Sequence, residues 1–171
     1  NPVHRLGHHI ERPLLRHGKV RDKNEARERS HALLEEVGLK PGAAIANKHP
    51  HEASGGQRQR VAIARALSVD PLLILADEPT SMLDVSVRVG VLNLMLKLKE
   101  ERGLAFLYIT HDLASARYFA DRTVVMYAGH IVESAPSEEL MQGPAHPYSQ
   151  LLLSAVPDPR GSISRPLAAR S

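Results

Sequence analysis

The most constraining stretch of this sequence runs from residue 53 to residue 67, where a Ser-Gly-Gly turn leads directly into a strongly helical segment. Ser54, Gly55 and Gly56 form the turn, and good helix formers follow it. The first N–H groups of a helix lack partners within it, and the helix dipole places its positive end there. Together with the serine hydroxyl, these groups favour a bound phosphate. The stretch therefore predicts a helix whose N-terminus is a candidate phosphate site.

Composition narrows the class of protein. With 171 residues, of which 43% are hydrophobic, the chain is long enough for one domain-sized core. The formal net charge of +3 is small and the basic residues are scattered, which indicates a solvated surface rather than a nucleic-acid site. The absence of cysteine excludes a disulfide scaffold and cysteine-ligated clusters. No apolar run reaches the roughly 20 residues that cross a bilayer, so membrane association is expected only through a partner.

The residues before the turn are predicted to be helical. Residues 48–51 predict a loop, because the residue before a proline is driven out of helical geometry. Gly38 is placed to end the preceding helix. His4 and His8 have helical spacing, but no carboxylate or cysteine completes a metal site, and we interpret them as surface residues. The apolar face of the preceding helix is formed by Ala32, Leu33, Leu34, Val37 and Leu39.

Beyond the turn, the pattern predicts strands and helices in alternation. Residues 72–76 form a continuous apolar run, typical of a strand buried on both faces of a parallel sheet. Residues 85–101 fit both a strand and a helix, but their length, their Lys/Glu-rich end and Asp84 as a possible N-cap favour a helix. Residues 104–109 predict a second buried strand. This order predicts an α/β fold with a parallel sheet.

The last part of the chain predicts smaller elements. Residues 113–120 predict a short helix. Residues 124–127 and 131–133 flank an Ala-Gly-His tripeptide, which favours a hairpin. The tail from residue 157 onward is expected to be poorly ordered.

Polar side chains follow both predicted strands. Asp77 and Glu78 come directly after the first strand, and His111 follows the second. Ligands of open α/β sheets bind at the carboxyl ends of the strands, so we expect these side chains at one edge of the sheet. Taken alone, the same residues also fit a polar cap on a strand and a structural histidine.

Four segments in fixed order resemble the second half of an ATP-binding-cassette (ABC) ATPase: residues 53–67, 72–80, 81–84 and 109–112. The resemblance implies a partial P-loop NTPase domain, with a helical signature subdomain, parallel-sheet core strands and a short C-terminal extension. It assigns residues 1–70 to the helical subdomain with the signature helix, residues 71–135 to the second half of the ATPase core, and residues 136–171 to the extension.

The resemblance also implies roles for the polar residues. It makes Asp77 the Walker B aspartate, which acts on Mg²⁺ directly or through water. Glu78 is then the general base that polarises the attacking water, and His111 is the switch histidine that contacts the γ-phosphate. The cofactors implied are ATP and Mg²⁺.

In this family the signature turn, here Ser54, Gly55 and Gly56, closes over a nucleotide held by the opposite subunit. These residues would donate to that γ-phosphate, and Gln57 would pack the turn. Ala53 stands where the family usually has a larger apolar residue, which leaves the packing beneath the turn in doubt.

Residues 81–84 resemble the D-loop of the family. The resemblance places Ser81 and Asp84 at the nucleotide, and Asp84 also fits a helix N-cap. Met82 stands where alanine is more common, an apolar departure from which we expect little consequence.

No Walker A sequence, Gly-x-x-x-x-Gly-Lys-Ser/Thr, occurs in the 171 residues. The resemblance therefore leads us to expect the C-terminal portion of a nucleotide-binding subunit, without the Walker A and glutamine loops. Because nothing in this portion grips the β-phosphate, the 171 residues alone are expected to be inactive and poorly soluble.

Residues 143–157, with Pro-Ala-His-Pro-Tyr and a leucine-rich helix, resemble the extension of oligopeptide and dipeptide importers, a group that also takes up nickel and opines. The cysteines that ligate an iron–sulfur cluster in some members are absent. The resemblance implies an ATP-hydrolysing subunit that powers a peptide-type importer. Its implied partners are a second ATPase subunit, membrane permease subunits and, indirectly, a solute-binding protein, with no nucleic acid. Its implied place is the cytoplasmic face of the inner membrane, as a peripheral subunit.

Two alternatives stay open at this point. A soluble ABC ATPase of DNA repair or chromosome organisation would carry long heptads or a zinc module before the signature, and residues 1–50 have neither. A truncated cassette that only binds or dimerises is not excluded by the residues present. The transported solute cannot be determined from these residues.

Overall fold

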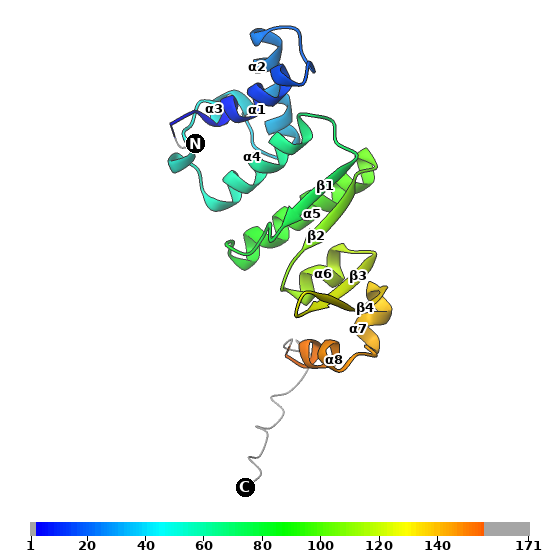
Figure 1. Cartoon of the computed structure of the whole chain (residues 1–171). Coiled ribbons are helices and arrows are strands. Elements are labelled where there is room, and N and C mark those ends of the chain that lie inside the picture. Colours follow the sequence, from blue (N-terminus) through cyan, green and yellow to red (C-terminus); the bar gives the residue numbers. More distant parts are fainter. Residues whose placement is uncertain (1–2, 156–171) are drawn as a thin grey trace. The chain divides into compact units, whose positions relative to one another are not determined.

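The computed structural model describes residues 3–155, and these form two compact units that divide between Thr110 and His111. Figure 1 shows the elements along the chain. The first unit contains α1 (Leu6–Arg16), α2 (Lys23–Glu36), α3 (Gly42–Ala46), the 3₁₀ turn Pro50–Glu52, α4 (Gly55–Leu67), β1 (Leu73–Asp77), α5 (Val85–Arg102) and β2 (Ala105–Ile109). The second unit contains α6 (Leu113–Phe119), β3 (Arg122–Tyr127), β4 (His130–Pro136), α7 (Ser137–Gln142) and α8 (Pro147–Ser154).

The helices α1 to α4 pack into a small bundle in which α2 contacts the other three. Apolar residues at helical spacing point into its core, including Ile10 and Leu14 of α1 and Leu67 of α4, which are at most 1% exposed. Gly38 adopts a left-handed backbone (φ +79°) just after α2, as expected for a residue that ends a helix. Ala32, predicted to lie on the buried face, is instead exposed, because the apolar stripe of α2 is centred on Leu33 and Leu34.

β1, α5 and β2 form a β–α–β unit whose two strands pair in parallel, as predicted (Figure 1). The prediction that both strands are buried on both faces is wrong for the described residues. Leu73 and Leu75 of β1 are 53% and 70% exposed. On β2, Leu107, which pairs with Leu75, is 54% exposed, and Ile109 is 50% exposed. In the described part of this unit the sheet has two strands, and a crossover helix covers a single face of such a pair. The strands themselves, and the helix over 85–101, are confirmed.

The second unit is built on the predicted hairpin. β3 and β4 pair antiparallel through a turn at Ala128 and Gly129, which both have positive φ (49° and 81°), as a tight two-residue turn requires. The short helix predicted over 113–120 is α6, and the leucine-rich helix of the extension is α8. The tail expected to be poorly ordered lies outside the described residues.

Glu133 of β4 holds the Pro-Ala-His-Pro-Tyr segment against the hairpin. Its two carboxylate oxygens accept the amides of Ala145 (2.7 Å) and His146 (3.1 Å), which lead into α8. The Ser149 hydroxyl, followed by the Ala145 amide, lowers the pKa of Glu133 below its ordinary value of 4.5. Tyr148, the second residue of α8, lies against Tyr127 of β3, with ring centres 4.4 Å apart.

Because the pKa of Glu133 is lowered in the folded state, this carboxylate contributes to the stability of the fold above pH 4.5. The contribution is lost as the pH falls through the folded-state pKa. We expect Glu133→Gln to weaken the attachment of α8 at neutral pH, with amide exchange at Ala145 and His146 faster by roughly tenfold. Hydrogen exchange, corrected for its intrinsic pH dependence, checks this. Glu139→Gln, an exposed glutamate of α7, is the control. Equal protection in both variants would contradict the role of Glu133.

Within the described residues, no helix has both the length and the apolar character that a membrane crossing needs.

Candidate nucleotide site

The start of α4 is organised by a reciprocal pair of hydrogen bonds. The Ser54 hydroxyl accepts from the amide of Gln57 (3.2 Å), and the Gln57 side chain accepts from the amide of Ser54 (3.1 Å). The amide of Arg58 donates to the Ser54 carbonyl (2.9 Å). The amides of Gly55 and Gly56 are thus the ones in the first turn that need a partner from outside the helix. Gln57 thus closes the turn with its side chain, and the Ser54 hydroxyl, which accepts a hydrogen bond here, still has its own hydrogen to donate.

The two glycines of the signature turn let it lie directly on the segment that leads into α5. A Cβ placed on Gly55 would be 3.3 Å from Cδ2 of Leu83, and one placed on Gly56 would collide with Cγ1 of Val87. Leu83 belongs to the predicted D-loop and Val87 to the first turn of α5. The sequence resemblance did not indicate this contact, because residues 55–56 and 83–87 are brought together only by the packing of α4 on α5.

Gly56→Ala is expected to destabilise the fold by about 1–2 kcal/mol, which is the cost of overpacking less the gain in helix propensity. Alanine is the better helix former by about 1 kcal/mol, but overpacking against Val87 costs more. Urea unfolding measures the change, and Val87→Ala in the same chain should recover most of the loss. Gly143→Ala is the matched control, since a Cβ there meets nothing within 4 Å. An unchanged free energy of unfolding for Gly56→Ala would contradict the close contact.

The two carboxylates predicted at the end of the first strand are held in place by backbone contacts. Asp77 is the last residue of β1 and pairs with Ile109 of β2. Glu78 has a positive φ (43°), and its amide donates to the Ile109 carbonyl (2.9 Å). Its own carbonyl accepts from the Ser81 hydroxyl (3.0 Å) and the Ser81 amide (3.2 Å). Both side chains are exposed, while Pro79 and Thr80 behind them are buried.

Residues 81–84 close a tight turn before α5. Asp84 is its N-cap, as predicted: it accepts from the amide of Val87 (2.9 Å) and the hydroxyl of Ser86 (2.8 Å). The bond from Val87, and then that from Ser86, lower the pKa of Asp84, so the group stays a carboxylate at neutral pH. Met82 is 97% exposed, so the apolar departure here disturbs no packing in this unit.

The signature turn and the end of β1 both line one open hollow of about 660 Å³. Of the predicted site residues, it brings together Gly55, Asp77, Glu78 and Ser81. Arg58 and Gln59 of α4 also line it, and sequence reasoning missed both. Their spacing after the signature turn was the available signal, because residues three and four beyond Gly55 lie on the same helix face.

His111 is the first residue of the second unit, whereas Glu78 belongs to the first unit. The place of His111 beside Glu78 therefore stays a prediction.

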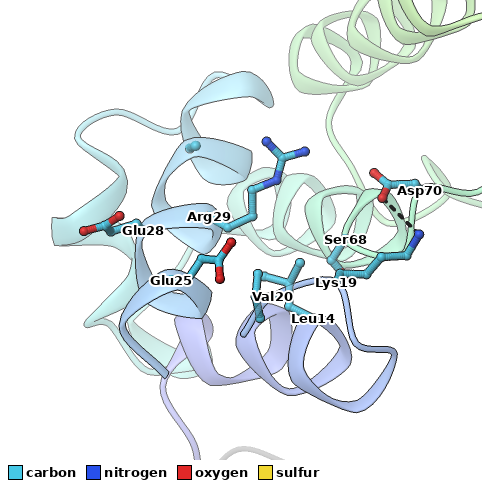
Figure 2. A pocket seen from close by; sticks show the side chains of 9 residues that line it. Leu14, Lys19, Val20, Glu25, Glu28, Arg29, Ser68 and Asp70 are labelled. Carbon is cyan, nitrogen blue, oxygen red and sulfur yellow. Dashed lines mark ion pairs between the residues drawn. The ribbon is translucent and has the colours of Figure 1, made fainter. Parts of the chain in front are cut away.

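A second hollow of about 480 Å³ lies in the helical bundle and contains none of the predicted site residues. Figure 2 shows it between the end of α1, α2 and the end of α4, with Lys19 and Asp70 joined by an ion pair (3.1 Å) at its edge. Glu25, Glu28 and Arg29 of α2 line its other side.

Comparison with known proteins shows which proteins this chain is similar to. Residues 4–81 match the model of the ABC transporter family, and residues 132–170 match the C-terminal region of oligopeptide/dipeptide transporters. The chain is thus similar to the ATP-binding proteins of ABC transporters in both regions. In agreement, the structure is similar to the dimeric cassette MJ0796 bound to ADP and Pi, with a TM-score of 0.68 and 36% identity over 80% of this chain and 58% of that one.

Curated relatives of the chain include ATP-binding proteins named for peptide transport. It is 52% identical over 149 residues to the oligopeptide transport ATP-binding protein OppF of Bacillus subtilis, covering 87% of this chain and 48% of that protein. It is 46% identical over 157 residues to the dipeptide transport ATP-binding protein DppF of Haemophilus influenzae, covering 92% of this chain and 47% of that protein. The chain thus spans about half the length of the curated relatives it matches. The predicted fold class, a partial ABC ATPase domain, is confirmed.

Proposed function

We propose that this chain is part of an ATP-hydrolysing subunit that powers a peptide-type ABC importer. The observation that carries the proposal is a pair of exposed carboxylates, Asp77 and Glu78, at the end of a parallel strand, beside the N-terminus of α4. The match of residues 132–170 to the oligopeptide/dipeptide transporter region supports peptides as the substrate class. The names of the relatives support the same class.

In this proposal each site residue has one task. Asp77 fits a magnesium ligand, because Mg²⁺ is commonly held by one or two carboxylates together with substrate phosphates, and Asp77 opens onto the hollow. Bound Mg²⁺ would neutralise phosphate charge. Glu78, held by its backbone bonds to Ile109 and Ser81, accepts a proton from the attacking water. His111 orients that water and contacts the γ-phosphate.

The signature turn acts on the nucleotide of a second subunit. The amides of Gly55 and Gly56 and the Ser54 hydroxyl donate to its γ-phosphate, and Ser81 and Asp84 of the D-loop lie at the same interface. The dimeric form of the similar cassette supports this arrangement. The further partners are permease subunits, indirectly a solute-binding protein, and no nucleic acid, at the cytoplasmic face of the inner membrane. The division into residues 1–70, 71–135 and 136–171 is part of the proposal.

The test joins this sequence to a Walker A-bearing half and reconstitutes the subunit with a peptide permease in vesicles. ATP-dependent uptake of a labelled tripeptide, together with phosphate release, is the expected result. Phosphate release that no peptide stimulates, with no uptake, would contradict the transport role, and absence of both activities would contradict the proposal as a whole.

A further inference from the structure

Arg60 of α4 connects three elements through its guanidinium group. Nη1 donates to the carbonyl of Val37, the residue that directly follows α2 (2.6 Å). Nη2 donates to the carbonyl of Gly90 in α5 (3.2 Å). The Val37 carbonyl lies at a helix end, where a carbonyl needs a donor from outside the helix. A planar guanidinium can donate to two acceptors in different directions.

Two glycines leave the space that this guanidinium occupies. A Cβ at Gly38 would lie 2.9 Å from Nη1 of Arg60, and a Cβ at Gly90 would lie 3.3 Å from Nη2. Arg60 therefore sits between α2 and α5 where other residues would place side chains. The Arg60 position is a fitted contact between elements that are far apart in the sequence, rather than a solvated surface charge.

α2 is also joined to α5 directly, without Arg60. The Arg102 guanidinium at the end of α5 pairs with both oxygens of Glu36 at the end of α2, at 2.7 and 2.6 Å. Loss of Arg60 thus leaves α2 and α5 joined at Glu36 and Arg102.

The position of Arg60 along α4 connects it with the site. α4 begins at the signature turn and α5 begins at the end of the D-loop, and the two touch there through Gly55 with Leu83 and Gly56 with Val87. The bond to Gly90 is a second point of attachment between the same two helices, further along both. With this bond the two helices are held at their N-terminal ends and again further along, which restricts any change in their relative direction.

We propose that Arg60 is a positioning residue, which holds the signature turn at a set place relative to the D-loop; the inference rests on the proposed ATPase function. Arg60 contacts no reacting atom. It acts through α4, so its loss moves the phosphate donors of Gly55 and Gly56 without changing the groups that capture ATP in the same subunit. Small displacements of positioned groups slow a reaction steeply, by up to about 100-fold for roughly 1 Å.

The test uses a complete ATP-binding subunit that carries this sequence. Arg60→Met keeps the aliphatic stem and removes the donors, and we expect kcat to fall about tenfold while ATP affinity stays within about twofold. Arg60→Lys, which can reach one carbonyl, should give an intermediate kcat. Arg65→Met, on an exposed arginine of the same helix, is the matched control.

A second variant separates positioning from stability. Gly90→Ala places a methyl group against Nη2 of Arg60, yet alanine is the better residue in a helix. We expect an unchanged or higher melting temperature together with a kcat about threefold lower.

The outcomes are distinguishable. A kcat for Arg60→Met equal to that of Arg65→Met, with Glu78→Gln inactive, overturns the positioning role and leaves the proposed function intact. Parallel losses of melting temperature, ATP affinity and kcat in Arg60→Met, with unchanged kcat in Gly90→Ala, also overturn it, since they indicate a purely structural role. Full activity of Glu78→Gln overturns the proposed function itself.

Discussion

Glu78→Gln, in a complete ATP-binding subunit that carries this sequence, is expected to lower ATP turnover by about 100-fold or more while ATP remains bound. Glutamine has the shape of glutamate but cannot accept the proton of the attacking water. The backbone of Glu78 is fixed by its bonds to Ile109 and Ser81, so the substitution should leave the geometry of the strand end unchanged.

Phosphate release measures the loss of turnover, and gel filtration with radiolabelled ATP shows whether a closed, ATP-bound dimer accumulates. Glu100→Gln, an exposed glutamate of α5, is the matched control for the change of charge. Hydrolysis by Glu78→Gln at the rate of Glu100→Gln would show that Glu78 is not the base.

Ser54→Asp is expected to inactivate the nucleotide site of the opposite subunit by about 100-fold. Aspartate is as good an N-cap as serine, so the bond from the Gln57 amide and the fold of α4 are retained. The added negative charge then faces the γ-phosphate. Ser54→Asn, equal in size and also a good N-cap but neutral, is the control and should retain far more activity.

Mixed dimers show which site Ser54 serves. If Ser54 acts on the partner's nucleotide, Ser54→Asp in one subunit and Glu78→Gln in the other damage the same site, and the second site stays intact. The two substitutions in one subunit damage both sites. We therefore expect at least about tenfold more turnover when the substitutions are in opposite subunits. The reverse order would mean that the signature turn serves its own subunit.

Several local features follow from the sequence alone, because they depend on neighbours along the chain. Ser54 is the N-cap of α4 and Asp84 is the N-cap of α5, since a short polar side chain can accept hydrogen bonds from the first amides of a helix. Gly38 ends α2 because its backbone must turn left-handed there. The resemblance to ABC ATPases is also readable from sequence, since their motifs are short segments in fixed order.

What surrounds each element was decided only by the tertiary structure. Apolar strands at 72–76 and 104–109 are recognisable from their residues, but how much of them is covered depends on which layers pack on the sheet, and one face of the pair is exposed here. Other contacts join residues that are far apart in the sequence, such as Gly56 with Val87. The hydrogen-bonded pairs are 23 to 66 positions apart: Arg60 with Val37, Arg60 with Gly90, and Glu36 with Arg102. No local pattern encodes such pairs, because they arise when helices with independent sequences pack together, and they determine where the signature turn lies relative to the D-loop.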